Sequence, residues 1–356
     1  MQFHSGRAAE VTFRNGRAPA TAYRAPAWLP GRHVQTIYPF FLPRPNVNYR
    51  RERIETPDAD FWDVDWAGTP SDAASTAPVL VVFHGLEGNS QSAYARHLML
   101  EAAALGWRGV VPHFRGCSDE PNRMPRAYHS GDHAEVASIL AAVRARVDPR
   151  TPLVAVGVSL GGSALLNWLG RAGPAAGNTL AAAATASVPL DLMAAGISIG
   201  QGFNRLYAWH FLQTLRPKAI ALAARFPGRL DAQRIARARS MRDFDDAVTA
   251  PLHGFADVTD YWTRGSSKPW LKSIGVPTLV LNARNDPFVP AASLPSSDAV
   301  SSWVQLEQPA TGGHAGFPHG SFPGQADWLP RHLTSFLATA LRGNRERLPL
   351  TESTSG

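Results

Sequence analysis

Short apolar runs that alternate with helix-like segments place the strongest constraint on the fold of this 356-residue chain. Apolar runs bounded by Gly, Pro or Asp predict buried parallel strands, and they lie at 78–84, 108–114, 152–158, 180–188, 277–283 and 302–308. Segments with helical character lie at 92–106, 131–147, 162–173 and 325–341. Because parallel strands need crossover connections, this order predicts an α/β protein with a mostly parallel central sheet flanked by helices.

One long region interrupts the alternation. Residues 189–270 separate the fourth predicted strand from the fifth, and they contain helical, aromatic-rich segments such as 203–215 and 234–248. We predict that this region forms an inserted helical cap, or lid, over a core made of 26–188 and 271–342.

The most apolar stretch, 179–196, is rich in Ala and is interrupted by Pro189 and Asp191. A membrane-spanning helix needs about 20 strongly apolar residues. We therefore predict a buried strand followed by a loop here, and no integral membrane segment. The first residues, MQFHSGRAAE, lack the apolar run of a signal peptide, and the single cysteine, Cys117, excludes an internal disulfide. We accordingly expect a cytoplasmic protein.

The formal net charge of +7 is concentrated near the N-terminus, since residues 1–53 hold nine Arg and two acids while the rest of the chain balances. We predict a flexible basic arm over 1–25 and a mobile polar tail over 343–356. The arginines are scattered among Pro and Ala without aromatic stacking residues, which argues against nucleic-acid binding. Peripheral contact of the arm with a membrane, a transit-peptide role and a solvated extension stay open, and we favour the last.

The motif GVSLG at 157–161 fits G-x-S-x-G and lies between an apolar strand and a helix. That setting is typical of a nucleophile elbow, a strained turn that exposes a serine hydroxyl above the sheet. Side chains two residues before and after the serine would collide with neighbouring groups, which explains Gly157 and Gly161. We therefore predict Ser159 as a catalytic nucleophile; the alternative is a tight glycine turn with an incidental serine.

A serine hydroxyl needs a base to take its proton and a carboxylate to orient that base. Proteins with this elbow carry the acid and then the histidine further along the chain. Asp286 follows the fifth predicted strand and His314 lies in a Gly-rich loop after the sixth, so we predict that both meet Ser159 at the carboxyl edge of the sheet. The rival base is His319, and the rival acids are Asp257, Asp260 and Glu307.

The segment FHGLEG at 83–88 follows the first predicted strand. A His-Gly turn in this position directs a backbone N–H toward the oxygen that becomes negative during acyl transfer. We predict the amides of Leu86 and Leu160 as the two donors of this oxyanion hole, with His84 and Gly85 shaping the loop. His84 is interpreted as a buried turn histidine that bonds to backbone groups and does not react.

Metal and nucleotide chemistry have little support in the sequence. His129 and His133 are four residues apart, but no HExxH motif and no obvious third ligand accompany them. Neither a Walker A motif nor G-x-G-x-x-G is present. We therefore expect no metal and no cofactor. Asp132 is expected to cap a helix entry, and Cys117 is expected to be a packing residue.

Seven segments together resemble the YheT-like branch of the α/β-hydrolases, the abhydrolase-domain esterases and lipases. In chain order they are RHVQTIYPF (32–40), HGLEGNSQSAY (84–94), HFRGCSDEPNR (113–123), YHSGD (128–132), GVSLGG (157–162), NARNDPF (282–288) and GGHAGF (312–317). The resemblance implies an α/β-hydrolase fold with a helical cap, a Ser159–Asp286–His314 triad, and hydrolysis of carboxylic, often lipid-like, esters without a cofactor. The chain departs from the family pattern at His113 and at Arg32, where Asn is common, and these departures bear on substrate range.

The residues and the resemblance together predict a serine carboxylesterase that cleaves a small-molecule ester through an acyl-enzyme on Ser159. Aromatic residues of the cap suggest an apolar acyl pocket, although packing within the cap explains them equally well: Phe203, Tyr207, Trp209, Phe211, Tyr261 and Trp262. The alternatives are a phospholipase or acylglycerol lipase at membrane surfaces and, from another class, a non-catalytic binding protein. The sequence leaves acyl length, alcohol group and oligomeric state open.

Overall fold

The computed structural model describes residues 23–68 and 76–347. Its centre is an eight-stranded sheet in the order β1-β2-β4-β3-β5-β6-β7-β8. The strands are β1 (Tyr49–Glu55), β2 (Phe61–Ala67), β3 (Val79–Phe83), β4 (Arg108–Pro112), β5 (Leu153–Val158), β6 (Ala182–Ala186), β7 (Thr278–Leu281) and β8 (Val304–Glu307). The strands from β3 to β8 pair in parallel, so the predicted mostly parallel sheet is confirmed.

All six predicted strands are present, but β1 and β2 were not predicted. They form an antiparallel hairpin, and β2 also pairs antiparallel with β4. Charged residues are depleted in strands, which hid the hairpin from sequence reasoning. In the structure the charges are paired across it, because the Nε of Arg51 donates to Asp65 and that of Arg53 to Asp63, both at 2.8 Å. The pairing lets Asp63 and Asp65 be buried inside β2.

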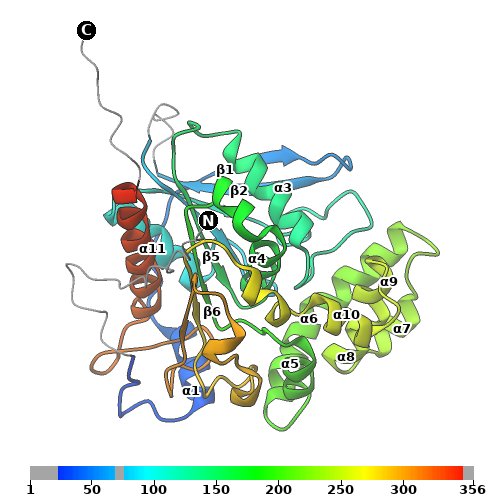
Figure 1. The fold of residues 1–356 in the computed structure, drawn as a ribbon. Coiled ribbons are helices and arrows are strands. Elements are labelled where there is room, and N and C mark those ends of the chain that lie inside the picture. Colours follow the sequence, from blue (N-terminus) through cyan, green and yellow to red (C-terminus); the bar gives the residue numbers. More distant parts are fainter. Residues whose placement is uncertain (1–22, 69–75, 348–356) are drawn as a thin grey trace, which may run out of the picture.

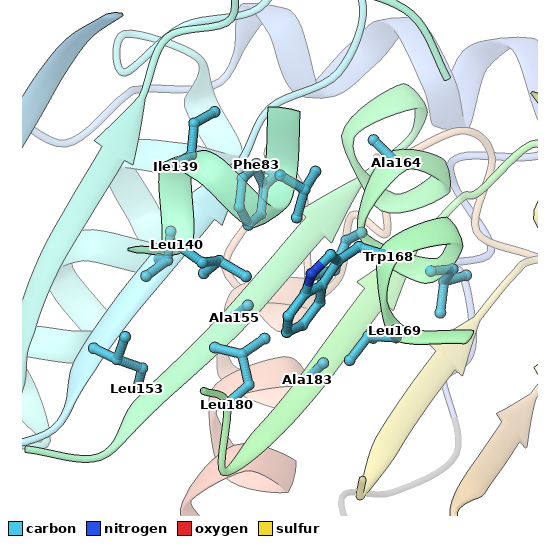
Figure 2. Packing of buried hydrophobic residues seen from close by; sticks show 14 of the residues in the cluster. Phe83, Ile139, Leu140, Leu153, Ala155, Ala164, Trp168, Leu169, Leu180 and Ala183 are labelled. Atoms are coloured by element: carbon cyan, nitrogen blue, oxygen red, sulfur yellow. The ribbon is translucent and has the colours of Figure 1, made fainter. Parts of the chain in front are cut away.

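Helices cover both faces of the sheet, and β3 shows how its residues divide between them. Val79, Val81 and Phe83 pack in one hydrophobic cluster with α3 (His133–Arg144) and α4 (Leu160–Ala172), part of which Figure 2 shows. Leu80 and Val82 pack in the other cluster, with α2 (Ala93–Ala104) and α11 (Trp328–Arg347). Successive strand residues point to opposite faces, so a fully apolar strand is buried on both. Figure 1 shows α11 on one side of the sheet and α3 and α4 on the other.

The helices between β6 and β7 lie within the region 189–270. They are α5 (Leu192–Ile199), α6 (Asn204–Arg225), α7 (Ala232–Arg237), α8 (Met241–Phe244), α9 (Ala250–Leu252) and α10 (Val258–Gly265), and they gather beside one end of the sheet in Figure 1. The loop predicted after the fourth strand is wrong, because Asp191 caps α5 there by accepting the Ala194 amide. Segment 234–248 is broken by a second helix start at Ser240, which forms a capping box with Asp243.

The two ends of the described chain are more ordered than the predicted boundaries suggest. Tyr23 is buried, and its hydroxyl donates to the Pro318 carbonyl at 2.7 Å, so the end of the predicted arm over 1–25 is packed against the core. The rest of that arm, 1–22, lies outside the described residues. At the other end α11 continues to Arg347, into the predicted tail 343–356, of which 348–356 lie outside the described residues.

Candidate active site

Ser159 occupies a strained turn between β5 and α4. Its φ is +53°, a conformation that residues with a side chain rarely adopt. A Cβ on Gly157 would lie 2.6 Å from the Gly162 Cα, and one on Gly161 would lie 2.3 Å from the His84 carbonyl oxygen. Both contacts are shorter than packed atoms allow, so the turn requires glycine at these two positions, for the steric reason that the sequence suggested.

The structure brings Ser159, His314 and Asp286 together from three separate loops. His314 Nε2 lies 3.0 Å from Ser159 Oγ, and His314 Nδ1 lies 2.8 Å from Asp286 Oδ2. The other oxygen of Asp286 accepts the Phe288 amide at 2.8 Å, and the residue is only 3% exposed. With the Nδ1 proton directed at the carboxylate, Nε2 presents its lone pair to the serine hydroxyl, which is the arrangement that general-base activation needs.

The rival residues lie elsewhere in the structure. His319 pairs through Nε2 with Asp327 at 2.6 Å. Asp257 caps α10 by accepting the amide of Asp260, and the Asp260 carboxylate is held by an arginine of the same helix. Glu307 accepts a hydrogen bond from a histidine of α11. Each rival therefore has a local structural role. The hydrogen-bond partner of Ser159 Oγ within the described residues is His314.

The loop after β3 is held by two tyrosines that sequence reasoning missed. The Gly85 amide donates to the Tyr94 hydroxyl at 2.9 Å, and the Glu87 amide donates to the Tyr128 hydroxyl at 2.7 Å. The intervening amide, that of Leu86, donates to no acceptor in the described part of the chain. Burial raises the pKa of both tyrosines, so both hydroxyls keep their protons at neutral pH.

Leu160, the other predicted donor, is the first residue of α4. An amide at the first turn of a helix has no acceptor within the helix, and the positive end of the helix dipole lies beside it. A Cβ built on Gly85 would lie 3.2 Å from the Ser159 Cβ, so the loop after β3 closely approaches the elbow. One amide thus belongs to the loop after β3 and the other to the first turn of α4, and both elements adjoin the serine.

His84 is fully buried and bonds to backbone on both sides, as expected. The Phe114 amide donates to His84 Nε2 at 3.0 Å, which requires that nitrogen to be unprotonated. Nδ1 then carries the proton and donates to the Gly85 carbonyl at 2.8 Å. Burial lowers the pKa of His84 to about 3, so the ring is neutral and holds the turn in place.

A short helix from the N-terminal segment, α1 (Arg32–Ile37), supports the loop that carries His314. Thr36 Oγ1 accepts the His314 amide at 3.0 Å, and Gln35 Oε1 accepts the Gly312 amide at 3.1 Å. Both supporting side chains are buried. A Cβ on Gly316 would lie 2.1 Å from the Gln35 carbonyl oxygen, so helix and loop are in close contact. In the sequence analysis Gln35 and Thr36 appeared only as part of a motif shared with the family, RHVQT, and their support of the His314 loop was not predicted.

Ser159 and His314 open into a cavity of about 1380 Å³ between the core and the helices of 189–270. The lining is mostly apolar, and it includes five of the six aromatic residues suggested from the sequence: Tyr207, Trp209, Phe211, Tyr261 and Trp262, but not Phe203. One lining group is the half-buried Asp245, and removal of its carboxyl from water raises its pKa to about 6. A cavity of this kind can hold an apolar ligand with its polar end near Ser159.

In the described residues, no three His, Cys, Asp or Glu side chains converge in a way that could hold a metal ion. Asp132 caps α3 by accepting the Glu135 amide, and Cys117 is buried, which raises its pKa to about 12. Across residues 23–68 and 76–347, no helix combines the length with the hydropathy that a transmembrane span needs.

Comparison with known proteins agrees with the fold and with the position of the site. A family model described as the alpha/beta hydrolase fold matches residues 78–320, and the chain therefore belongs to the α/β-hydrolase family. It is 38% identical over 315 residues to "Putative esterase YheT" of Escherichia coli (strain K12). The aligned region covers 87% of this chain and 91% of the relative. The predicted YheT-like resemblance is confirmed.

A second relative extends the range of named activities. The chain is 32% identical over 322 residues to "Phospholipase ABHD3" of Homo sapiens, across 89% of this chain and 78% of the relative. Among solved structures, the Pyrococcus furiosus esterase Pf2001 superposes with a TM-score of 0.53 at 14% identity, over 82% of this chain and 92% of that one, which supports the fold. The protein is thus an α/β-hydrolase of the esterase and lipase type.

Proposed function

We propose that the protein is a serine carboxylesterase in which Ser159, His314 and Asp286 form the catalytic triad. The observation that carries the proposal is the continuous relay from Ser159 Oγ through the imidazole to a buried carboxylate, with contacts of 3.0 and 2.8 Å. Relatives named as an esterase and a phospholipase support ester hydrolysis as the reaction class. The apolar cavity beside Ser159 favours esters with apolar acyl chains.

The proposed reaction has two halves. Ser159 Oγ attacks the ester carbonyl carbon while its proton passes to His314 Nε2, and the resulting oxyanion is stabilised by the Leu86 and Leu160 amides. Collapse of this intermediate breaks the bond to the alcohol, which takes the proton from Nε2. Water then attacks the acyl-enzyme, giving its proton to Nε2, and the released Ser159 oxygen takes the proton back as the carboxylic acid leaves. Asp286 stays ionised and holds the imidazole in one tautomer.

Ser159→Ala tests the assignment. We expect turnover of a short p-nitrophenyl ester to fall about 10⁴- to 10⁶-fold, and labelling by a fluorophosphonate to disappear. Ser163→Ala, one turn further along α4, is the matched control because Ser163 is buried and its hydroxyl bonds to no described residue. Undiminished hydrolysis by purified Ser159→Ala, or labelling that follows Ser163, would refute the proposal.

A further inference from the structure

We propose that the mouth of the active-site cavity docks on bilayers that contain anionic phospholipids. The docking surface, called the rim below, consists of seven exposed apolar side chains from two segments, 24–48 and 192–230, in which Ile220 is exposed as well but is not counted: Val34, Phe40, Phe41, Ile197, Phe203, Leu206 and Trp209. This inference goes beyond ester hydrolysis, and it concerns binding that can be measured without any turnover.

The rim is unusual because large apolar side chains face solvent there. Phe41 is 79% exposed, Phe40 is 64% exposed and Trp209 is 56% exposed. Single exposed apolar residues are common on protein surfaces, but a group of them usually marks an interaction site. Four other large hydrophobic residues of the described chain are exposed: Leu100, Ile220, Trp303 and Phe322.

The two segments meet around the cavity. The rings of His33 and Phe203 are 4.5 Å apart, and His33 Nδ1 lies 3.2 Å from the Tyr207 hydroxyl, so α1 contacts the start of α6. Phe40 from the first segment and Leu206 and Trp209 from the second line the cavity and are also exposed. Part of the rim therefore borders the cavity that leads to Ser159. In Figure 1, α1 and α5 lie on the same side of the molecule.

The charge of the rim identifies the partner. Residues 24–48 contain three arginines and no acid, and residues 192–230 contain four arginines, one lysine and no acid. Arg32, Arg44 and Arg205 are exposed, and no ion pair joins any of them to a carboxylate of the described residues. Two exposed acids that also line the cavity, Asp119 and Glu120, lie outside both segments and contact Arg51 and Arg53 of β1.

Aromatic side chains beside unpaired arginines fit the interface of an anionic bilayer. Aromatic rings insert at the level of the headgroups, while each Lys or Arg near an anionic surface strengthens binding about fivefold. A second copy of the chain fits less well. A symmetric contact through this face would bring basic surface against basic surface, with no acid in either segment to compensate. The geometry and charge together favour lipid as the occupant.

Sedimentation with vesicles tests the proposal on the full chain, in which the basic arm is retained. We expect wild-type protein to bind phosphatidylcholine vesicles that contain phosphatidylserine, to bind pure phosphatidylcholine much more weakly, and to dissociate as salt rises. Phe41→Ser and Phe203→Ser, which do not line the cavity, should each lower the partition coefficient about tenfold. Arg32→Ser and Arg205→Ser should each lower it about fivefold.

Two exposed residues outside the rim provide matched controls. Trp303 precedes the N-terminal end of β8, at the edge of the sheet opposite Ser159, and Leu100 lies on α2. Trp303→Ser and Leu100→Ser should bind vesicles as wild type does, with unchanged melting temperatures in all variants. Failure of wild type to prefer anionic vesicles would overturn the proposal. The proposal would also be overturned if the rim variants bound vesicles as strongly as wild type does. It would be overturned as well if wild type formed a dimer without lipid and the rim substitutions abolished that dimer.

Discussion

Replacing Tyr128 by Phe removes one hydroxyl and leaves the ring in place. That hydroxyl accepts the Glu87 amide at 2.7 Å and donates to the Glu87 carboxylate at 3.2 Å. A buried amide that loses its acceptor costs about 1–3 kcal/mol, which the loop can avoid by rotating its peptide units and misdirecting the Leu86 amide. Loss of an entire oxyanion-hole donor costs about 10²- to 10³-fold in kcat. Loss of its orientation should cost less, about 5- to 50-fold.

The assay is the hydrolysis of a short p-nitrophenyl ester, with kcat and KM measured separately. We expect kcat to fall and KM to stay, because the apolar cavity binds the substrate and the amides act on charge that forms later. Affinity for a trifluoromethyl ketone, which forms a tetrahedral adduct, should fall by the same factor as kcat/KM. Tyr94→Phe should behave alike, since its hydroxyl accepts the Gly85 amide on the other side of Leu86.

Tyr49→Phe is the matched control. Its hydroxyl donates to the Ser90 carbonyl at 3.0 Å, close to the same loop, and does not accept an amide of residues 85–87. We expect Tyr49→Phe to lower the melting temperature as much as Tyr128→Phe and Tyr94→Phe do, but to keep the kcat of wild type. The reasoning fails if Tyr128→Phe and Tyr94→Phe raise KM without lowering kcat, or if Tyr49→Phe lowers kcat as much as they do.

Three further predictions concern the supports of the site. Gly161→Ala places a methyl group 2.3 Å from a carbonyl oxygen and should lower the free energy of unfolding, measured in urea, by about 3 kcal/mol or more. The control Gly177→Ala, whose methyl group would lie 3.6 Å from its nearest neighbour, should lower it by less than about 0.5 kcal/mol. Equal urea midpoints for the two variants would contradict this prediction. Thr36→Val removes the acceptor of the His314 amide, so kcat should fall about 5- to 100-fold with KM kept, and an unaltered kcat would exclude this support. Burial raises the pKa of Asp245 from 3.8 to about 6, so the folded state holds this proton more tightly than the unfolded chain. The unfolding free energy of wild type relative to Asp245→Asn should therefore fall by about 2 kcal/mol as pH rises from about 4 to about 6, and a constant difference in calorimetry would refute it.

The sequence predicted the parallel sheet well because its strands are buried on both faces and are therefore continuously apolar. It failed at β1 and β2, where the stabilising feature is a set of Arg–Asp pairs across the hairpin, which no local pattern reveals. It also failed at α5, where Gly196 weakens the helical signal. That glycine is needed because a Cβ there would lie 2.5 Å from the Trp262 ring.

Some residues of the candidate site could likewise be predicted from the sequence, and others could not. Ser159, Asp286 and His314 could be predicted to lie together because each follows a strand in a recognisable local setting, and their side chains do meet in the structure. Tyr128 was not, because its contact with Glu87 joins residues 41 positions apart and depends on how two loops fold over each other. Gln35 and Thr36 are still harder to find, since their role exists only once the chain has closed on itself.

The support of the His314 loop by α1 has a consequence for synthesis of the protein. Thr36 and His314 are 278 positions apart, so Thr36 leaves the ribosome long before His314 does. A nascent chain that has made the elbow still has no imidazole to deprotonate Ser159. Under the proposed mechanism, a chain in which the His314 loop has not yet formed is inert toward esters, and reactivity arrives in one step when that loop docks onto α1.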